Sequence, residues 1–251
     1  MRRIGLNRLG MGRSALVWTA LAACVAFAPG CPPPGPGTYT LENDALRVEV
    51  AGASGAFLSI FNKRTNQELI ALHDPGDTQP PWRLRRTPVP FLFPSDTRSY
   101  TSVTVTPSAI PGGDALDVVW TLAPSDQIVT RLELLDASEE LVMTANYVNN
   151  GSLYGAALEY PLLEGIGDLS QPGADSFLLS AQFHGLLYRN PFTLFAPGAQ
   201  NGISGGDYPT AVGGAMQTYA YYTEGVGGFQ LAALDPSNTV KNLAFAKNAA
   251  N

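Results

Sequence analysis

The sequence has few of the residue types that usually bind metals or carry nucleophilic chemistry. Its 251 residues include only two cysteines, Cys24 and Cys31, and two histidines, His73 and His184. Both cysteines lie within the first 31 residues, so the rest of the chain has no disulfide and no thiolate metal site. The two histidines lie far apart in the sequence. We therefore assign no metal ligands and no cofactor, while oxygen-ligated calcium stays open.

Basic residues are also scarce. Four of the fifteen Lys and Arg lie in the first 31 residues and none of the 21 acidic residues does, which leaves eleven bases against 21 acids, a net charge of −10. The one basic cluster is Arg83, Arg85 and Arg86. A surface this acidic repels a phosphate backbone, so nucleic acid is excluded as a partner.

Residues 1–31 have the pattern of a lipoprotein-type signal peptide. Four arginines precede an apolar run that is short for a membrane span. Leu21 to Cys24 matches the bacterial lipobox, while Cys31 gives a longer apolar run and directly precedes a Pro/Gly tether at 32–37. The sequence predicts an exported protein held at a membrane by a lipid on Cys24, with Cys31 as the alternative.

The segment from Leu41 to Asp74 predicts a three-strand meander. Leu46, Val48 and Val50 alternate with charged residues, which is the period of a half-buried strand. Small-residue and polar turns then separate two further apolar stretches. The core face of the first strand is therefore legible in the sequence.

Alternating or β-branched stretches, separated by Gly, Pro and Asn turns, continue to the end of the chain. They are Trp82–Arg86, Tyr100–Thr106, Leu116–Leu122, Ile128–Leu135, Leu141–Val148, Tyr154–Leu163, Phe177–Phe183, Met216–Tyr222, Gly228–Leu234 and Val240–Ala246. No amphipathic helix is evident outside the signal peptide, and Pro191 to Pro209 has little periodicity. The spacing predicts an all-β fold, a large antiparallel β-sandwich formed by residues 38–251 as one domain.

Several strings resemble one family of sandwich domains. They are Glu42 to Val50, Gly55-Ala56, Leu58 to Thr65, Glu68-Leu69, Ser176 to Leu179, Gly185, Asn190-Pro191, Tyr208-Pro209, Met216-Gln217, Tyr221-Tyr222 and Gly227 to Asp235. Together they resemble the galactose-mutarotase-like β-sandwich (a supersandwich) that precedes the catalytic barrel in some bacterial glycoside hydrolases. The match spans nearly the whole chain after the tether.

The resemblance implies a function associated with carbohydrate but without catalysis. In such enzymes the catalytic carboxylates lie in the barrel, downstream of the sandwich, whereas this chain stops at Asn251 just after the last sandwich-like strand. The expectation is the N-terminal, non-catalytic module of a longer glycosidase-like protein, with a carbohydrate and a catalytic barrel as partners.

Two other interpretations stay open. The first is a carbohydrate-active enzyme, of the mutarotase, epimerase or glycosidase type, that uses His184 and a nearby carboxylate. The histidine contexts typical of mutarotases are missing, and no spacing pairs two carboxyl groups for glycoside hydrolysis. We therefore assign no catalytic residue. The second is a structural surface lipoprotein without a sugar ligand.

Sugar binding needs aromatic faces and planar polar groups. The candidates are Trp82, Arg83, His184, Arg189, Tyr208, Tyr219 and Tyr221. Tyr219 and Tyr221 share one strand face, and Tyr222 takes the other. The same rings are equally suited to core packing, which the sequence alone does not decide. Trp120 lies in the apolar register of its strand and is expected in the core.

Overall fold

The computed structural model describes residues 37–71, 79–86, 95–122, 125–150, 156–180, 185–195, 207–208, 217–234, 241–242 and 245. The predicted signal peptide, both cysteines and most of the tether lie outside these residues, as do His73 and His184. The described part is built from antiparallel strands and one helix of four residues, α1 (Pro191–Leu194). The predicted all-β class is confirmed.

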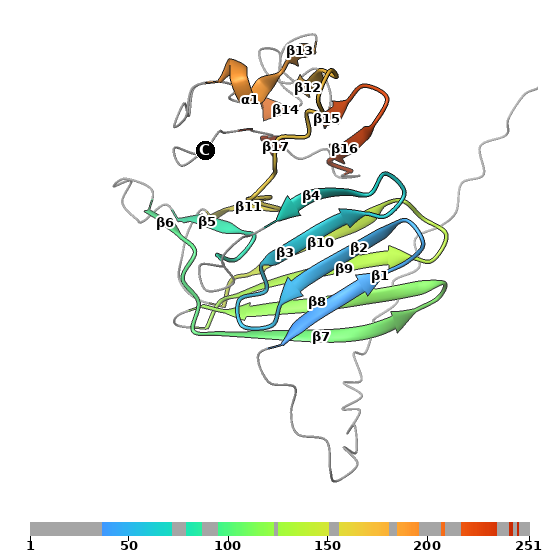
Figure 1. The fold of residues 1–251 in the computed structure, drawn as a ribbon. Coiled ribbons are helices and arrows are strands. Elements are labelled where there is room, and N and C mark those ends of the chain that lie inside the picture. The colour runs from blue at the N-terminus through green and yellow to red at the C-terminus, as the bar shows by residue number, and fades with distance from the viewer. Residues whose placement is uncertain are drawn as a thin grey trace, which may run out of the picture. The chain divides into compact units, whose positions relative to one another are not determined.

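Two four-stranded sheets form the N-terminal sandwich. The first has the order β1-β2-β3-β4, from β1 (Thr38–Glu42), β2 (Leu46–Ala51), β3 (Phe57–Asn62) and β4 (Gln67–Ala71). The second has the order β10-β9-β8-β7, from β7 (Ser102–Ile110), β8 (Gly113–Thr121), β9 (Gln127–Leu135) and β10 (Leu141–Val148). Figure 1 shows the first sheet lying over the second.

Three further sheets complete the described fold. One is β11-β5-β6, from β5 (Arg83–Arg86), β6 (Ser95–Thr97) and β11 (Ala156–Glu159). Another is β13-β12-β15-β16, from β12 (Ser176–Ser180), β13 (Leu186–Arg189), β15 (Thr218–Thr223) and β16 (Gly227–Ala232). The last pairs β14 (Asp207–Tyr208) with β17 (Lys241–Asn242).

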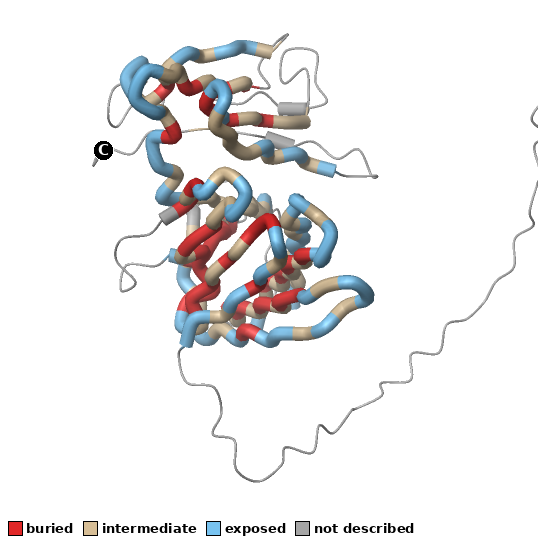
Figure 2. Tube along the Cα trace, turned by 45° about the vertical axis from the view of Figure 1, so that its right-hand side comes forward, coloured by how far each residue is buried: buried red, intermediate tan, exposed pale blue. Residues whose placement is uncertain are grey.

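The core of the sandwich follows the alternation of its strands. Val48 and Val50 are 0% exposed and Leu46 is 7% exposed, whereas Arg47 and Glu49 between them are half-buried. On β8 the buried residues include Val118 and Trp120, as their register predicts. Figure 2 shows this change from buried to partly exposed along the strands. Burial of apolar side chains between two layers is the main source of stability in such a fold.

Asn43 links the two sheets at one end. Its Oδ1 accepts hydrogen bonds from the backbone N–H groups of Ala45 and Leu46, at 2.8 and 2.7 Å. Its Nδ2 donates to the carbonyls of Leu135 and Ser138, at 2.7 and 2.8 Å. One amide therefore closes the turn between β1 and β2 and holds it against the end of β9.

Most predicted strands are present, with shifted ends. The segment predicted from Trp82 begins one residue later in β5, and the strand predicted from Tyr100 runs instead over β7 to Ile110. The stretch from Pro191 to Pro209, predicted to lack regular structure, begins with helix α1 and contains β14. Strand β13 is missing from the prediction, because Leu186 and Leu187 give no alternation.

Candidate functional site

Three of the predicted sugar-binding aromatics lie in the interior. Trp82 is 0% exposed and packs edge-to-face on Trp120, with ring centroids 6.0 Å apart. Tyr219 and Tyr221 are 6% and 1% exposed. A ring that protein covers on this scale has no free face for a sugar. In this structure these three side chains pack the core, which is the alternative that the sequence leaves open.

The buried face of the sheet β13-β12-β15-β16 explains the position of Tyr221. Its ring stacks on Phe192 of α1, with centroids 6.1 Å apart, and meets the edge of Phe229 on β16. Its hydroxyl accepts a hydrogen bond from the N–H of Leu169 and donates to Asp168, at 3.1 and 3.2 Å. Burial raises the pKa of this hydroxyl to about 12.

The two predicted arginines lie in different sheets, and each pairs with an acid. Arg83 on β5 donates to Glu159, its cross-strand partner on β11, at 2.7 Å. Arg189 on β13 forms an ion pair with Asp175. The structure does not bring the two guanidinium groups into one site. For Tyr208 only the backbone is described, in β14, and His184 lies outside the described residues.

The sheet β13-β12-β15-β16 exposes its other face, which sequence reasoning did not select. Phe177 on β12 and Tyr222 on β15 are register partners, and their rings stack with centroids 5.5 Å apart and planes 27° apart. Tyr222 is 37% exposed and Leu187 is 56% exposed. We call this surface the aromatic face; it consists of Phe177, Leu179, Leu187, Arg189, Tyr222 and Gln230.

The register arranges these side chains in two rows. One row runs Arg189, Phe177, Tyr222 and Gly228 across the four strands, and the other runs Leu187, Leu179, Ala220 and Gln230. Rows of this kind place side chains about 5 Å apart across a sheet. The rings therefore lie between a guanidinium on one side and a glycine on the other.

Gly228 lies close against the strand of Tyr222. A Cβ atom at this position would lie 2.4 Å from the Cα and 2.6 Å from the Cβ of Tyr222, so no other residue fits without movement. Gln230, two residues along the same strand, is exposed and donates from Nε2 to the Thr218 hydroxyl at 2.9 Å. The side of Tyr222 away from Phe177 therefore has a polar amide nearby and no side chain directly opposite.

The alternation of residues along β15 partly predicts this face. Alternation predicts Tyr222 on the strand face opposite Tyr219 and Tyr221, and that prediction is correct. What the sequence does not show is which of the two faces is covered. Helix α1 and the segment around Leu169 cover the Tyr221 face, and no pattern in the sequence predicts that either packs there.

The outer face of the sheet β10-β9-β8-β7 offers a different surface. Alternation places Thr106, Asp117, Arg131 and Thr144 in one row across it. Arg131 donates to both oxygens of Asp117, at 2.8 and 2.7 Å, and to Glu133 at 2.6 Å. The described side chains in this row include no aromatic ring, and its central charge is already paired.

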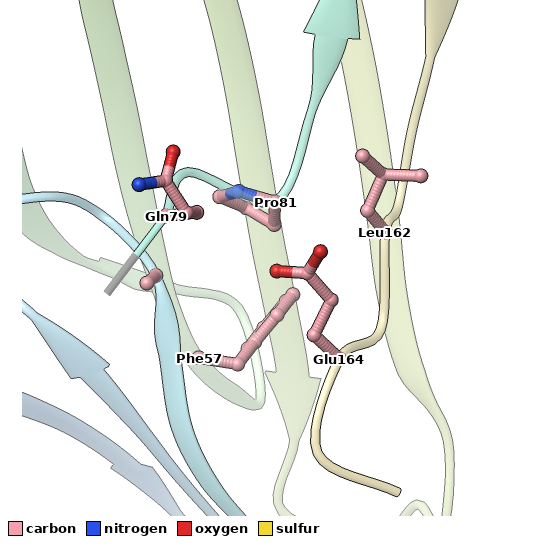
Figure 3. A pocket seen from close by; sticks show the side chains of 6 residues that line it. Phe57, Gln79, Pro81, Leu162 and Glu164 are labelled. Carbon is pink, nitrogen blue, oxygen red and sulfur yellow. The ribbon is translucent and has the colours of Figure 1, made fainter. Parts of the chain in front are cut away.

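A small hollow near the start of β3 is too small for a sugar. Its lining includes Phe57, Pro81, Leu162 and Glu164, whose side chains surround the space in Figure 3. The enclosed space holds about one water molecule. Glu164 also accepts two hydrogen bonds from Arg98, at 2.7 and 3.0 Å. The carboxylate is therefore paired with a cation.

The part of the chain with described coordinates contains no cluster of three or more His, Cys, Asp or Glu that could hold a metal ion. Within the same part, no helix is both long and apolar enough to cross a bilayer. Comparisons with protein families, with curated proteins and with solved structures gave no match.

Proposed function

We propose that this protein is an exported, non-catalytic carbohydrate-binding module that takes its ligand on the aromatic face. The observation that carries the proposal is the stacked, partly exposed pair of Phe177 and Tyr222 on a sheet surface. The C–H side of a pyranose is apolar and packs on aromatic rings, while its hydroxyls need planar donors and acceptors around them. Arg189 and Gln230 supply such groups on either side of the rings.

The free side of Tyr222 is the central contact of this proposal. A sugar ring placed over Gly228 would lie against the tyrosine ring and within reach of the Gln230 amide. Gly228 itself has no side chain to cover the tyrosine ring, and its backbone lies close to the Tyr222 strand. Leu179 and Leu187 extend the apolar surface along the adjacent row, which suits a chain of sugars better than a single one.

The proposed protein is exported, anchored to a membrane by a lipid and placed beside a catalytic barrel. The signal pattern supports export, with anchoring through Cys24 or, alternatively, Cys31. The resemblance to galactose-mutarotase-like sandwiches supports a role beside a glycoside-hydrolase barrel, whose substrate the module would hold near the catalytic domain.

The test is binding to a panel of polysaccharides by affinity gel electrophoresis and to a glycan array. The purified protein is expected to bind at least one glycan, and Tyr222→Ala is expected to weaken that binding about tenfold or more, since a buried aromatic contact is worth about 1.5–3 kcal/mol. Tyr222→Phe keeps the ring and is expected to retain most of the affinity. Thr144→Ala, on the outer face of the other sheet, is the matched control and is expected to bind as the unchanged protein does.

Two results would overturn the proposal. One is the absence of binding to every glycan tested by a protein that is folded by circular dichroism. The other is glycan binding that Tyr222→Ala leaves unchanged, which would place the ligand elsewhere on the molecule.

A further inference from the structure

The charge of the aromatic face is set by one ion pair. Arg189 is the one cation among its six residues, its side chain is 69% exposed, and it pairs with Asp175, the residue before β12. The other five side chains are uncharged. The face with its ion pair therefore carries no net charge, although it includes an exposed guanidinium.

Asp175 is positioned by a second contact, independent of Arg189. Asn190 donates from Nδ2 to Oδ1 of Asp175 at 2.8 Å. Asn190 is in turn held by the start of β12, because its Oδ1 accepts from the N–H of Ser176 at 2.9 Å and its own N–H donates to the Ser176 carbonyl at 2.7 Å. The carboxylate is thus held on both sides, by an amide anchored to backbone and by the guanidinium.

The pKa values agree with this geometry. The hydrogen bond from Arg189, and then that from Asn190, lower the pKa of Asp175. The same pair raises the pKa of Arg189. Asp175 therefore stays ionised at neutral pH, where the pair is intact.

We propose that the Asp175–Arg189 pair makes the aromatic face select neutral glycans and reject acidic ones such as uronates. This inference rests on the proposed function and names its ligand class. A carboxylate on the ligand would have to displace Asp175 from Arg189 or lie beside it, and like charges at close range repel. A sugar hydroxyl faces no such cost, since a guanidinium has five N–H donors and the carboxylate occupies only some of them.

The charge of the whole chain acts in the same direction. Beyond the tether the protein carries a net charge of −10. Its long-range field disfavours a polyanion before any contact is made. The local pair and the global charge therefore exclude the same ligands, but only the local pair can be removed by one substitution.

The experiment compares neutral polysaccharides with polygalacturonate, using the purified protein, Asp175→Asn and Asp136→Asn. Asparagine at 175 keeps an oxygen for the Asn190 amide and removes the negative charge. Asp136→Asn makes the same change of net charge at an exposed turn after β9. In affinity electrophoresis at low salt, we expect the unchanged protein and Asp136→Asn to bind neutral glycans and to bind polygalacturonate only weakly.

Asp175→Asn is expected to gain affinity for polygalacturonate by about fivefold over Asp136→Asn, the effect of one unit charge at about 4 Å in water. The gain should disappear at high salt, because the Arg189 side chain is 69% exposed and salt screens its attraction for the carboxylates of the polysaccharide. The inference alone is overturned if the unchanged protein binds polygalacturonate as tightly as neutral glycans, or if Asp175→Asn gains no more than Asp136→Asn. If no polysaccharide binds any of the three proteins, the proposed function itself is wrong.

Discussion

At the scale of single residues, the contrast between Tyr221 and Tyr222 shows which face of β15 is covered and which is open. They are neighbours in β15, yet Tyr221 is 1% exposed and Tyr222 is 37% exposed. The buried tyrosine uses its hydroxyl to hold Leu169 and Asp168, while the exposed one stacks on Phe177 at the surface. Alternation gives β15 two faces. Helix α1 and the segment around Leu169 cover the face of Tyr221, whereas the face of Tyr222 stays at the surface.

The buried hydroxyl leads to a prediction about alkaline pH. The pKa of Tyr221 is about 12 in the folded protein, against 10.0 for an unperturbed tyrosine. The unfolded chain therefore loses this proton first, so the stabilisation is complete below pH 10 and is lost as pH rises from 10 to 12. Tyr221→Phe should lower the free energy of unfolding at pH 8 by about 1–3 kcal/mol, because the buried N–H of Leu169 loses its acceptor.

The measurement is urea unfolding of both proteins at pH 8, 10 and 11. The gap between the unchanged protein and Tyr221→Phe should narrow above pH 10, since only the former has this group to ionise. Tyr222→Phe is the surface control and should change stability by less than about 0.5 kcal/mol at pH 8. A gap that stays constant to pH 11 would contradict the assigned role of the hydroxyl.

At the scale of elements, the turn between β2 and β3 docks one sheet on the other. Gly55 has φ 69°, a left-handed conformation, and a Cβ there would lie 2.4 Å from the Trp120 ring and 2.8 Å from Val118. The Trp120 indole N–H donates to the Ser54 carbonyl in the same turn, at 2.8 Å. The turn therefore needs glycine for two reasons, its backbone angle and its contact with β8.

Gly112 allows these two reasons to be separated. It has φ 76° in the turn between β7 and β8, and a Cβ added there would have no other atom within 4 Å. Gly112→Ala should cost about 1–2 kcal/mol from the backbone angle alone. Gly55→Ala should cost a further 1–3 kcal/mol, roughly, because the methyl group overpacks the Trp120 contact. If urea unfolding shows the same loss of unfolding free energy for both variants, the added methyl group at position 55 causes no overpacking against Trp120.

The strands differ in how well the sequence predicts them and their buried faces. Strands with strict alternation, such as those of Val48 and Trp120, are predicted correctly with their buried faces, because burial on one side imposes a period of two. Strand β13 escapes prediction because Leu186 and Leu187 are both exposed and break the pattern. The choice between Tyr221 and Tyr222 as surface residues depends on packing by α1 and the Leu169 segment, which are distant in sequence and leave no local signal.

At the scale of the whole molecule, ion pairs use most of the available bases. Of the eleven basic residues beyond the tether, eight pair with carboxylates in the described part: Arg47, Lys63, Arg64, Arg83, Arg85, Arg98, Arg131 and Arg189. Acids outnumber bases by ten, so a surplus of negative charge repels itself over distances longer than these contacts.

This charge distribution predicts that moderate salt stabilises the protein. The Debye length falls from about 30 Å at 0.01 M to about 10 Å at 0.1 M, which screens repulsion between distant acids but leaves ion pairs in contact largely intact. Each exposed pair contributes only about 0–1 kcal/mol in any case. Raising NaCl over this range should therefore raise the melting temperature by about 2–4 °C, equivalent to about 1 kcal/mol for a chain of this size.

Scanning calorimetry checks the salt effect, with Arg131→Gln as a variant that removes one of the paired bases. The surplus of acids grows in this variant, so its melting temperature should rise more with salt than that of the unchanged protein. A melting temperature that falls with salt would mean that the contact pairs contribute more stability than the repulsion between distant acids takes away.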